Sequence, residues 1–350
     1  MRLEQVKEIA NAVLYEGYLL YPYRHSAIKN RQRWTIGVVY PRTYSEANGG
    51  IEPWMMQTEC LLRGAADTEI DVYVRFLHLL LRSETGDERR RAESAQHMVV
   101  HWRPETWEEG IEREVTALSL VPDNLVARQN CVEFAFPAAR MVEQPAGRPA
   151  STIVREHQPI SGLIRLVAER IGPDLYRLRV CIENTTVPAH TSERRDAIML
   201  QSFISTHTIL QVRRGDFISL LDPPPELRDD AGRCQNLRTW PVLAGDEGEH
   251  DTLLSSPIIL YDYPQIAPES PGALFDGTEI DELLSLRIMT LTDEEKEEMR
   301  HADERARDSG ADRGAFTRTI DETAWHGAQP APAQRRGKMI GPLILSGSEE

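Results

Sequence analysis

The stretch from Ile160 to Glu183 constrains the fold more than any other part of the sequence. Apolar residues and one glycine recur at every second position in residues 160–166 and again in residues 176–182. Between these runs, Ile171–Asp174 reads Ile-Gly-Pro-Asp, which supplies the residues that tight turns favour. This pattern predicts a β-hairpin with one buried face and one wetter face.

Other segments carry weaker strand patterns. They alternate, or they are rich in β-branched and aromatic residues, and Gly or Pro bounds several of them. We expect a second hairpin turning at Arg214–Asp216. The predicted strands are Trp34–Tyr40, Ile70–Leu81, Met98–Trp102, Thr206–Val212 and Phe217–Leu221.

Helical spacing is found at the start of the chain and again at Pro53–Arg63. Leu3, Val6, Ala10 and Val13 share one face of an N-terminal helix. The segment Pro53–Arg63 fits a helix by the spacing of its apolar residues. The pattern leaves Trp107–Leu118 open between a strand pair and a short helix.

Strands at this spacing predict a mainly β fold with a β-sandwich or barrel-like core. With its peripheral helices, the whole chain would belong to the α+β class. We expect a β-rich core with its N-terminal helix over residues 1–276. A helical extension should follow over residues 277–301, where Thr292 and Glu295 form a capping box. Residues 302–350 are polar and predict a disordered tail that ends in an apolar segment, 339–345.

Charge and composition exclude several classes of function. With 41% hydrophobic residues the chain can bury a core, while its formal net charge of -15 argues against nucleic-acid binding as its main role. The longest apolar runs are strand-sized, so no membrane insertion is expected. Cys60, Cys131, Cys181 and Cys234 form no C-x-x-C pair, and with no signal-peptide pattern they indicate reduced thiols in the cytoplasm.

No catalytic motif is recognisable in the sequence. It lacks G-x-G-x-x-G, a Walker A loop and a G-x-S-x-G elbow, and we expect neither a cofactor nor enzyme activity. His97 and His101 would share a helix face and could bind zinc, but their neighbours favour a strand, on which they would be two polar surface positions. His78 reads as a core histidine.

A basic and aromatic segment near the N-terminus is a candidate partner surface. Arginine and aromatic side chains are favoured at protein interfaces, although strand aromatics that face the core would give the same pattern. The apolar end segment is a second candidate, as a docking peptide or as a frayed end. The predicted partner-binding residues are Tyr21, Tyr23, Arg24, Arg31, Arg33, Trp34, Tyr44, Ile340, Leu343 and Leu345.

Several long stretches carry a family resemblance: LYEGYLLYPYR from Leu14, PWMMQTECLLRG from Pro53, and the run from Ser255 to Lys296. Together with ISGLIRLVAE and LYRLRVCIENTT, they resemble the uncharacterised accessory proteins encoded beside actinobacterial-type, high-affinity uptake [NiFe]-hydrogenases. The resemblance spans most of residues 14–296. It implies a role in assembling or maturing the hydrogenase, and it implies no catalytic residue.

The first hypothesis is therefore a non-catalytic accessory protein that binds a protein partner, either a hydrogenase subunit or a maturation factor. A second hypothesis is a metallochaperone or an enzyme whose site is assembled from distant residues. The third is a structural subunit of a larger complex. For the second hypothesis the candidate ligands are His78, His97, His101, Cys60 and Cys131.

Overall fold

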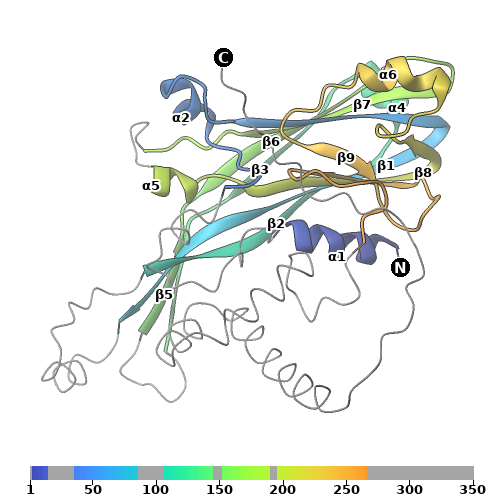
Figure 1. Ribbon diagram of the computed structural model, residues 1–350. Coiled ribbons are helices and arrows are strands. Elements are labelled where there is room, and N and C mark those ends of the chain that lie inside the picture. The colour runs from blue at the N-terminus through green and yellow to red at the C-terminus, as the bar shows by residue number, and fades with distance from the viewer. Residues whose placement is uncertain (1, 15–34, 86–105, 145–151, 190–194, 266–350) are drawn as a thin grey trace, which may run out of the picture.

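The computed structural model describes residues 2–14, 35–85, 106–144, 152–189 and 195–265 (Figure 1). Strands dominate, and the predicted mainly β class is confirmed. The helical elements are α1 (Arg2–Leu14), α2 (Arg42–Ala47), α4 (Pro122–Ala127), α5 (Arg195–Met199), η2 (Pro225–Leu227) and α6 (Arg228–Gly232). The strands are β1 (Met55–Thr85), β2 (Thr106–Leu120), β3 (Asn130–Phe136), β4 (Ala139–Glu143), β5 (Thr152–His157), β6 (Ile160–Arg170), β7 (Leu175–Asn184), β8 (Ile204–Ile218), β9 (Trp240–Leu243) and β10 (Thr252–Ser256).

One long strand, β1, organises the sheet. On one edge its first half pairs with β7 and its second half with β2, all antiparallel. On the other edge β8 pairs with residues 61–77 and β5 with residues 81–85. The sheet continues from β7 to β6 and β3, and from β8 to β10 and β9. Because β1 joins both halves, it carries the bend between them.

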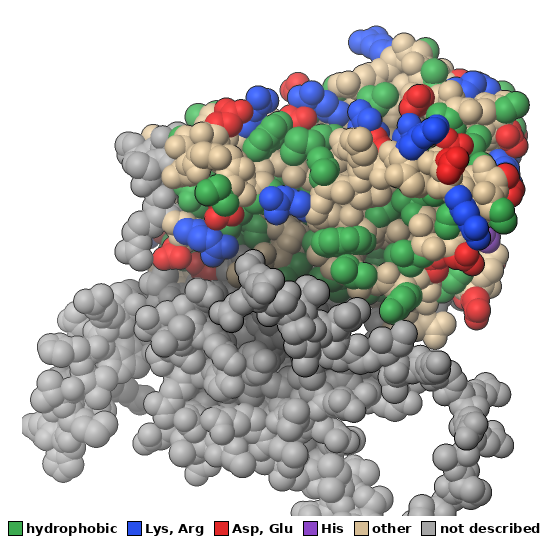
Figure 2. Space-filling model, turned by 45° about the horizontal axis from the view of Figure 1, so that its top comes forward, with side chains coloured by type: hydrophobic (Ala, Val, Ile, Leu, Met, Phe, Trp, Pro, Cys, Tyr) green, Lys and Arg blue, Asp and Glu red, His purple; other side chains and the backbone are tan. Residues whose placement is uncertain are grey.

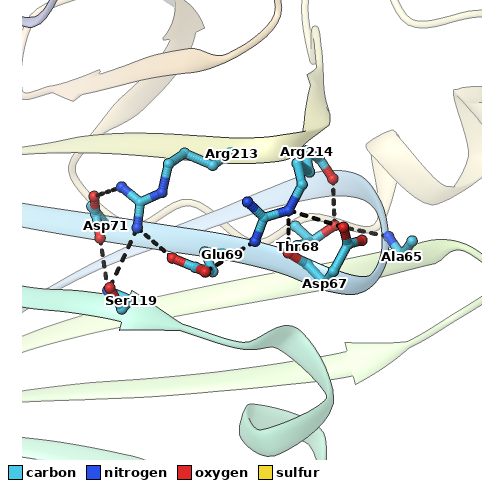
Figure 3. Close-up of polar contacts among 8 residues, drawn as sticks. All are labelled: Ala65, Asp67, Thr68, Glu69, Asp71, Ser119, Arg213 and Arg214. Atoms are coloured by element: carbon cyan, nitrogen blue, oxygen red, sulfur yellow. Dashed lines mark hydrogen bonds and ion pairs between the residues drawn. The ribbon is translucent and has the colours of Figure 1, made fainter.

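The bend of β1 lies at a bulge opposite β8. Gly64 pairs with Gly215 and Glu69 pairs with Arg213, so residues 65–68 of β1 lie opposite the single residue Arg214 of β8. The hydroxyl of Thr68 accepts a hydrogen bond from the amide of Ala65 (2.8 Å) and donates one to the carbonyl of Arg214 (2.5 Å), as Figure 3 shows. Arg214 has a φ of 57°, so the bulge bends both strands.

Carboxylates and guanidinium groups hold the bulge on its exposed side. Arg213 contacts Asp71 (2.5 Å) and Glu69 (2.6 Å), and Arg214 contacts Glu69 (2.9 Å) and Asp67 (2.9 Å). The hydrogen bonds from both arginines hold the pKa of the Glu69 carboxyl below its usual range. The pairs of Glu69 and Asp67 are exposed enough that we expect them to fix geometry more than to add stability, whereas Asp71 is buried at 6% exposure.

The main core lies on one side of the bent sheet, between its two halves. Phe76 of β1 stacks on Phe203 with ring centroids 4.6 Å apart, and Phe134 of β3 lies 5.8 Å from Phe76. β3 is thus brought over the second half of β1, although the two strands do not pair. A two-bond bridge between Gln57 and Leu237 also brings the segment before β9 back to the start of β1. The sheet therefore curls towards a barrel.

Helices α1, α2, α5 and α6 cover the other side of the sheet, whereas Leu125 of α4 packs in the main core. Val6, Ile9 and Ala10 of α1 pack on Ile209 and Leu254, which confirms the predicted N-terminal helix. A second cluster joins Tyr40 and Tyr44 to Leu77 and Leu79 of β1, and the η2–α6 segment covers Leu61 and Ile218. Apolar side chains on both faces of β1 are thereby removed from water.

Several sequence expectations need correction. Pro53–Arg63 is not helical, because Met55–Arg63 is the start of β1, paired throughout with β7. The hairpin expected at Arg214–Asp216 is absent, since β8 runs continuously through these residues. Of the Trp34–Tyr40 segment the structure describes residues 35–40, and of these only Val39 forms a bridge, to Phe203. Trp107–Leu118, for which the sequence allowed either a strand pair or a short helix, lies within the single strand β2.

The hairpin predicted for residues 160–183 is confirmed as β6 and β7. The strand Met98–Trp102, the extension 277–301 and the tail 302–350 lie outside the described residues.

Candidate functional site

A polar face at one end of the sheet is the best candidate for a functional site. The end of β1, the start of β2, and strands β5 and β4 form a four-stranded arm, found at the lower left of Figure 1. Alternation along β1 puts His78 and Arg82 on the same face as the core residue Phe76. The face that encloses the core thus becomes polar where the arm begins.

Charged side chains cross this inner face of the arm from strand to strand. Arg155 of β5 contacts Glu109 of β2 (3.0 Å) and Glu143 of β4 (2.6 Å). Arg82 of β1, which is 5% exposed, lies 3.6 Å from Glu109. Opposite charges therefore link all four strands of the arm.

Two histidines and an arginine lie between these charged side chains of the arm and the aromatic core. The rings of His78 and His157 meet edge-on with centroids 4.6 Å apart. Nη2 of Arg113 lies 3.4 Å from Nδ1 of His78, and its guanidinium lies over the ring of Phe136, 4.4 Å from the centroid. Three strands, β1, β2 and β5, supply the polar groups of this cluster, and β3 supplies the ring beneath it.

The environment of His78 keeps its imidazole neutral. Burial lowers its pKa to about 3, and the neighbouring His157 and Arg113 add to the effect, while the carbonyl of Gln158 opposes it. Since the guanidinium only donates, Nδ1 of His78 must accept, and its proton then resides on Nε2. Nε2 is buried and has no hydrogen-bond partner. His78 therefore acts as a neutral donor, and it cannot exchange protons near neutral pH.

Arg113 differs from the other sheltered arginines. Arg75, Arg82, Arg155, Arg165 and Arg177 each contact a carboxylate. Arg113 is half-buried, contacts no carboxylate of the described residues, and its Nε is buried without a partner. Burial lowers the pKa of its guanidinium, and no acidic neighbour counteracts this. The cluster thus carries one positive charge without a counter-ion.

Of the predicted partner-binding residues, the structure describes only Tyr44. Tyr44 is 8% exposed and stacks on Tyr40 with centroids 6.0 Å apart, so its ring belongs to the core and not to an exposed surface. The others lie outside the described residues: Tyr21, Tyr23, Arg24, Arg31, Arg33, Trp34, Ile340, Leu343 and Leu345.

The scattered histidines and cysteines proposed as a metal or catalytic site are not brought together where they are described. Cys60 is buried in the main core, and burial raises the pKa of its thiol. Cys131 is exposed on β3, and His78 lies in the arm. Among the described residues, no group of three or more His, Cys, Asp or Glu side chains could hold a metal ion. His97 and His101 lie outside the described ranges.

The sequence did not single out Arg113 or His157. Arg113 is one charged residue in the run Glu108–Glu114, where its neighbours are acidic. Alternation along β2 turns Glu112 and Glu114 to the opposite face, while Glu109, on the same face, contacts Arg82 and Arg155. His157 follows a short strand that the sequence analysis did not identify.

Comparison with known proteins gives no family assignment. No protein-family model matches the chain, and no curated protein matches it. Within the part of the chain that the structure describes, no helix has both the length and the hydropathy that crossing a bilayer requires.

Proposed function

We propose that this chain is a non-catalytic accessory protein of the cytoplasm that binds another protein during assembly or maturation of a [NiFe]-hydrogenase. The hydrogenase part of the proposal rests on the resemblance of Leu14–Arg24, Pro53–Gly64 and Ser255–Lys296. The partner is a hydrogenase subunit or a maturation factor. All four cysteines are free thiols, which agrees with a reducing compartment.

Strand β4 is the observation that favours protein binding. Every residue of β4 is exposed, and among the described strands β4 pairs with β5 alone. Met141 and Val142 are 49% and 59% exposed on this outer strand. An edge strand offers unpaired backbone groups to an added strand, and apolar side chains beside it contribute affinity.

The surface around the sheet suits a protein partner better than a polyanion. Figure 2 shows a face on which Lys and Arg side chains are interspersed with Asp, Glu and hydrophobic side chains. Arg140 of β4 lies 3.7 Å from Glu156 of β5, so the arm itself carries both signs. Mixed charge of this kind gives orientation and selectivity rather than general attraction to phosphates.

Four buried or half-buried histidine and cysteine side chains have strongly shifted pKa values and are unsuited to catalysis near neutral pH. Burial lowers the pKa of His78 and that of His207 to about 3. It raises the pKa of the Cys181 and Cys234 thiols to about 11. Groups shifted in these directions supply neither a general base nor a thiolate near neutral pH.

The test uses the full tagged chain in its native host. The captured partner is identified by mass spectrometry for wild type, for Met141→Lys/Val142→Lys, and for Val187→Lys, which alters a 78% exposed valine outside the arm. We expect a hydrogenase subunit or maturation factor with wild type and Val187→Lys, and its loss with the β4 variant. A gene deletion should lower hydrogenase activity and large-subunit processing; normal values for both would refute the hydrogenase role.

A further inference from the structure

We propose that Arg113, His78 and His157 form a binding subsite for a single carboxylate group on the inner face of the arm. The subsite is separate from the β4 edge, since its residues lie on β1, β2 and the end of β5. It can be tested whether or not the protein has the proposed assembly role.

The first argument is the charge of Arg113. Of the described arginines that are buried or half-buried, Arg113 is the one that contacts no described carboxylate. Glu109, a carboxylate on the same face of β2, contacts Arg155 at 3.0 Å and Arg82 at 3.6 Å instead. A sheltered guanidinium without a counter-ion is costly, and an anionic ligand would remove that cost.

The second argument is the kind of hydrogen-bonding group left without a partner. Nε2 of His78 and Nε of Arg113 are both buried and unpaired, and both are donors. The carbonyl of Gln158 lies beside these groups: it pairs with Nδ1 of His157 at 3.3 Å and also acts on His78, whose pKa it raises. Nε of Arg113 has no such neighbour, and the partner it lacks is an acceptor, which a carboxylate supplies with two oxygens.

The third argument concerns the net charge of the ligand and the chemical group to which that charge belongs. Arg113 provides one positive charge and His78 is neutral, so a monoanion is matched better than a phosphate dianion. The guanidinium is fixed over the ring of Phe136, which itself lies 6.0 Å from Phe134. Aromatic rings beneath the guanidinium suit a carboxylate that is attached to an organic group, because that group can pack on the rings. Its source is either a free small carboxylate or an acidic side chain of a bound protein, and the second source rests on the proposed function.

The experiment is a titration of the full chain followed by NMR signals of the Arg113 Nε–H and the His78 ring. The probes are acetate, a blocked Gly-Asp-Gly peptide, and a blocked Gly-Asn-Gly peptide as the neutral match, all at constant ionic strength. Arg113→Lys assigns the arginine signal. Arg128→Gln is the matched control, because Arg128 is exposed and distant in sequence from the cluster.

We expect saturable shifts with the Asp peptide, with a Kd of about 1–10 mM, and none with the Asn peptide. Arg113→Gln should weaken binding at least about tenfold, and Arg128→Gln should leave it unchanged. Saturation by acetate but not by the peptide would support the subsite and assign it to free carboxylates. No saturable shift with either carboxylate in the wild-type protein would overturn the proposal, and water would then satisfy the donors.

Discussion

The α-carbon of Gly162 on β6 lies directly against the ring of Phe134 on β3: a Cβ added to Gly162 would come within 2.2 Å of Cζ of that ring. The two residues are register partners. Phe134 in turn lies 5.5 Å from Phe203 across the core. The missing side chain of Gly162 therefore leaves the space that one of the core rings occupies.

We predict that Gly162→Ala destabilises the protein by about 1–3 kcal/mol, because the ring of Phe134 must leave its position among the core aromatics. Denaturant unfolding measures the change. Gly232→Ala is the matched control, since a Cβ there meets nothing within 4 Å, and it should be neutral or slightly stabilising. Equal effects of the two substitutions would show that Phe134 does not need this space.

The bulge of β1 gives a second prediction. Thr68 is fully buried, and its hydroxyl serves both the amide of Ala65 and the carbonyl of Arg214. Thr68→Val keeps the shape and leaves both groups unpaired, so we expect a loss of about 1–3 kcal/mol in the free energy of unfolding. Thr116→Val, on the exposed face of β2, should change it by less than about 0.5 kcal/mol. An unchanged unfolding midpoint for Thr68→Val would refute the bridging role.

A third prediction concerns acid stability. His207 is fully buried with Nδ1 2.8 Å from the carbonyl of Ser205, and burial lowers its pKa from 6.5 to about 3. Between these values the unfolded chain binds a proton that the folded chain does not, so stability falls as the pH decreases from about 6.5 towards 3. Above pH 6.5 both states are neutral and the effect vanishes.

Replacing His207 by Asn removes this titration and keeps a side-chain N–H for Ser205. We expect the pH dependence of the unfolding free energy between pH 6 and pH 4 to become shallower by up to about 1.4 kcal/mol per pH unit. His250→Asn is the control, because His250 also lies near a backbone carbonyl, that of Phe217, but is exposed. Identical slopes for wild type and His207→Asn would contradict the assignment.

The fourth prediction concerns Asn184, a fully buried residue at the end of β7. Its Nδ2 donates to the carbonyls of Val39 and Gln201, both at 2.9 Å, and its Oδ1 accepts from the amide of Thr186 at 3.0 Å. Asn184→Ala should destabilise the protein by about 2–4 kcal/mol, because three backbone groups lose a hydrogen bond and the Val39 carbonyl keeps only the one from the Phe203 amide. Thermal unfolding measures this against Asn124→Ala, an exposed asparagine in α4. A loss no larger than that of the control would contradict the anchoring role.

Much of the β structure was predictable from the sequence where a strand buries one face and exposes the other to solvent. In β6 the apolar positions from Ile160 to Ala168 are buried at every second residue, as the sequence pattern indicated. In the first half of β1, residues 56–62 are all buried, so no alternation is visible and the apolar spacing also fits a helix. The prediction for Pro53–Arg63 failed for this reason.

The turn expected in β8 failed for a different reason. Arg214-Gly215 has the residue types of a hairpin turn, but Arg214 adopts its positive φ opposite the bulge of β1. Local residue preferences do not distinguish a turn from a bulged strand, because both use the same backbone conformations. The neighbouring strand decides between them.

By itself the sequence determined the mainly β class, the N-terminal helix and the β6–β7 hairpin. These depend on contacts between residues near in sequence and on the period of the apolar positions. Only the tertiary structure decided the length and bend of β1, the place of Tyr44 in the core, and the meeting of Arg113 with His78 and His157. Arg113 and His78 come together through the register of β2 on β1, and His157 through that of β5 on β1. Such pairing of distant strands is set by the packing of the whole sheet, which no local pattern in the sequence records.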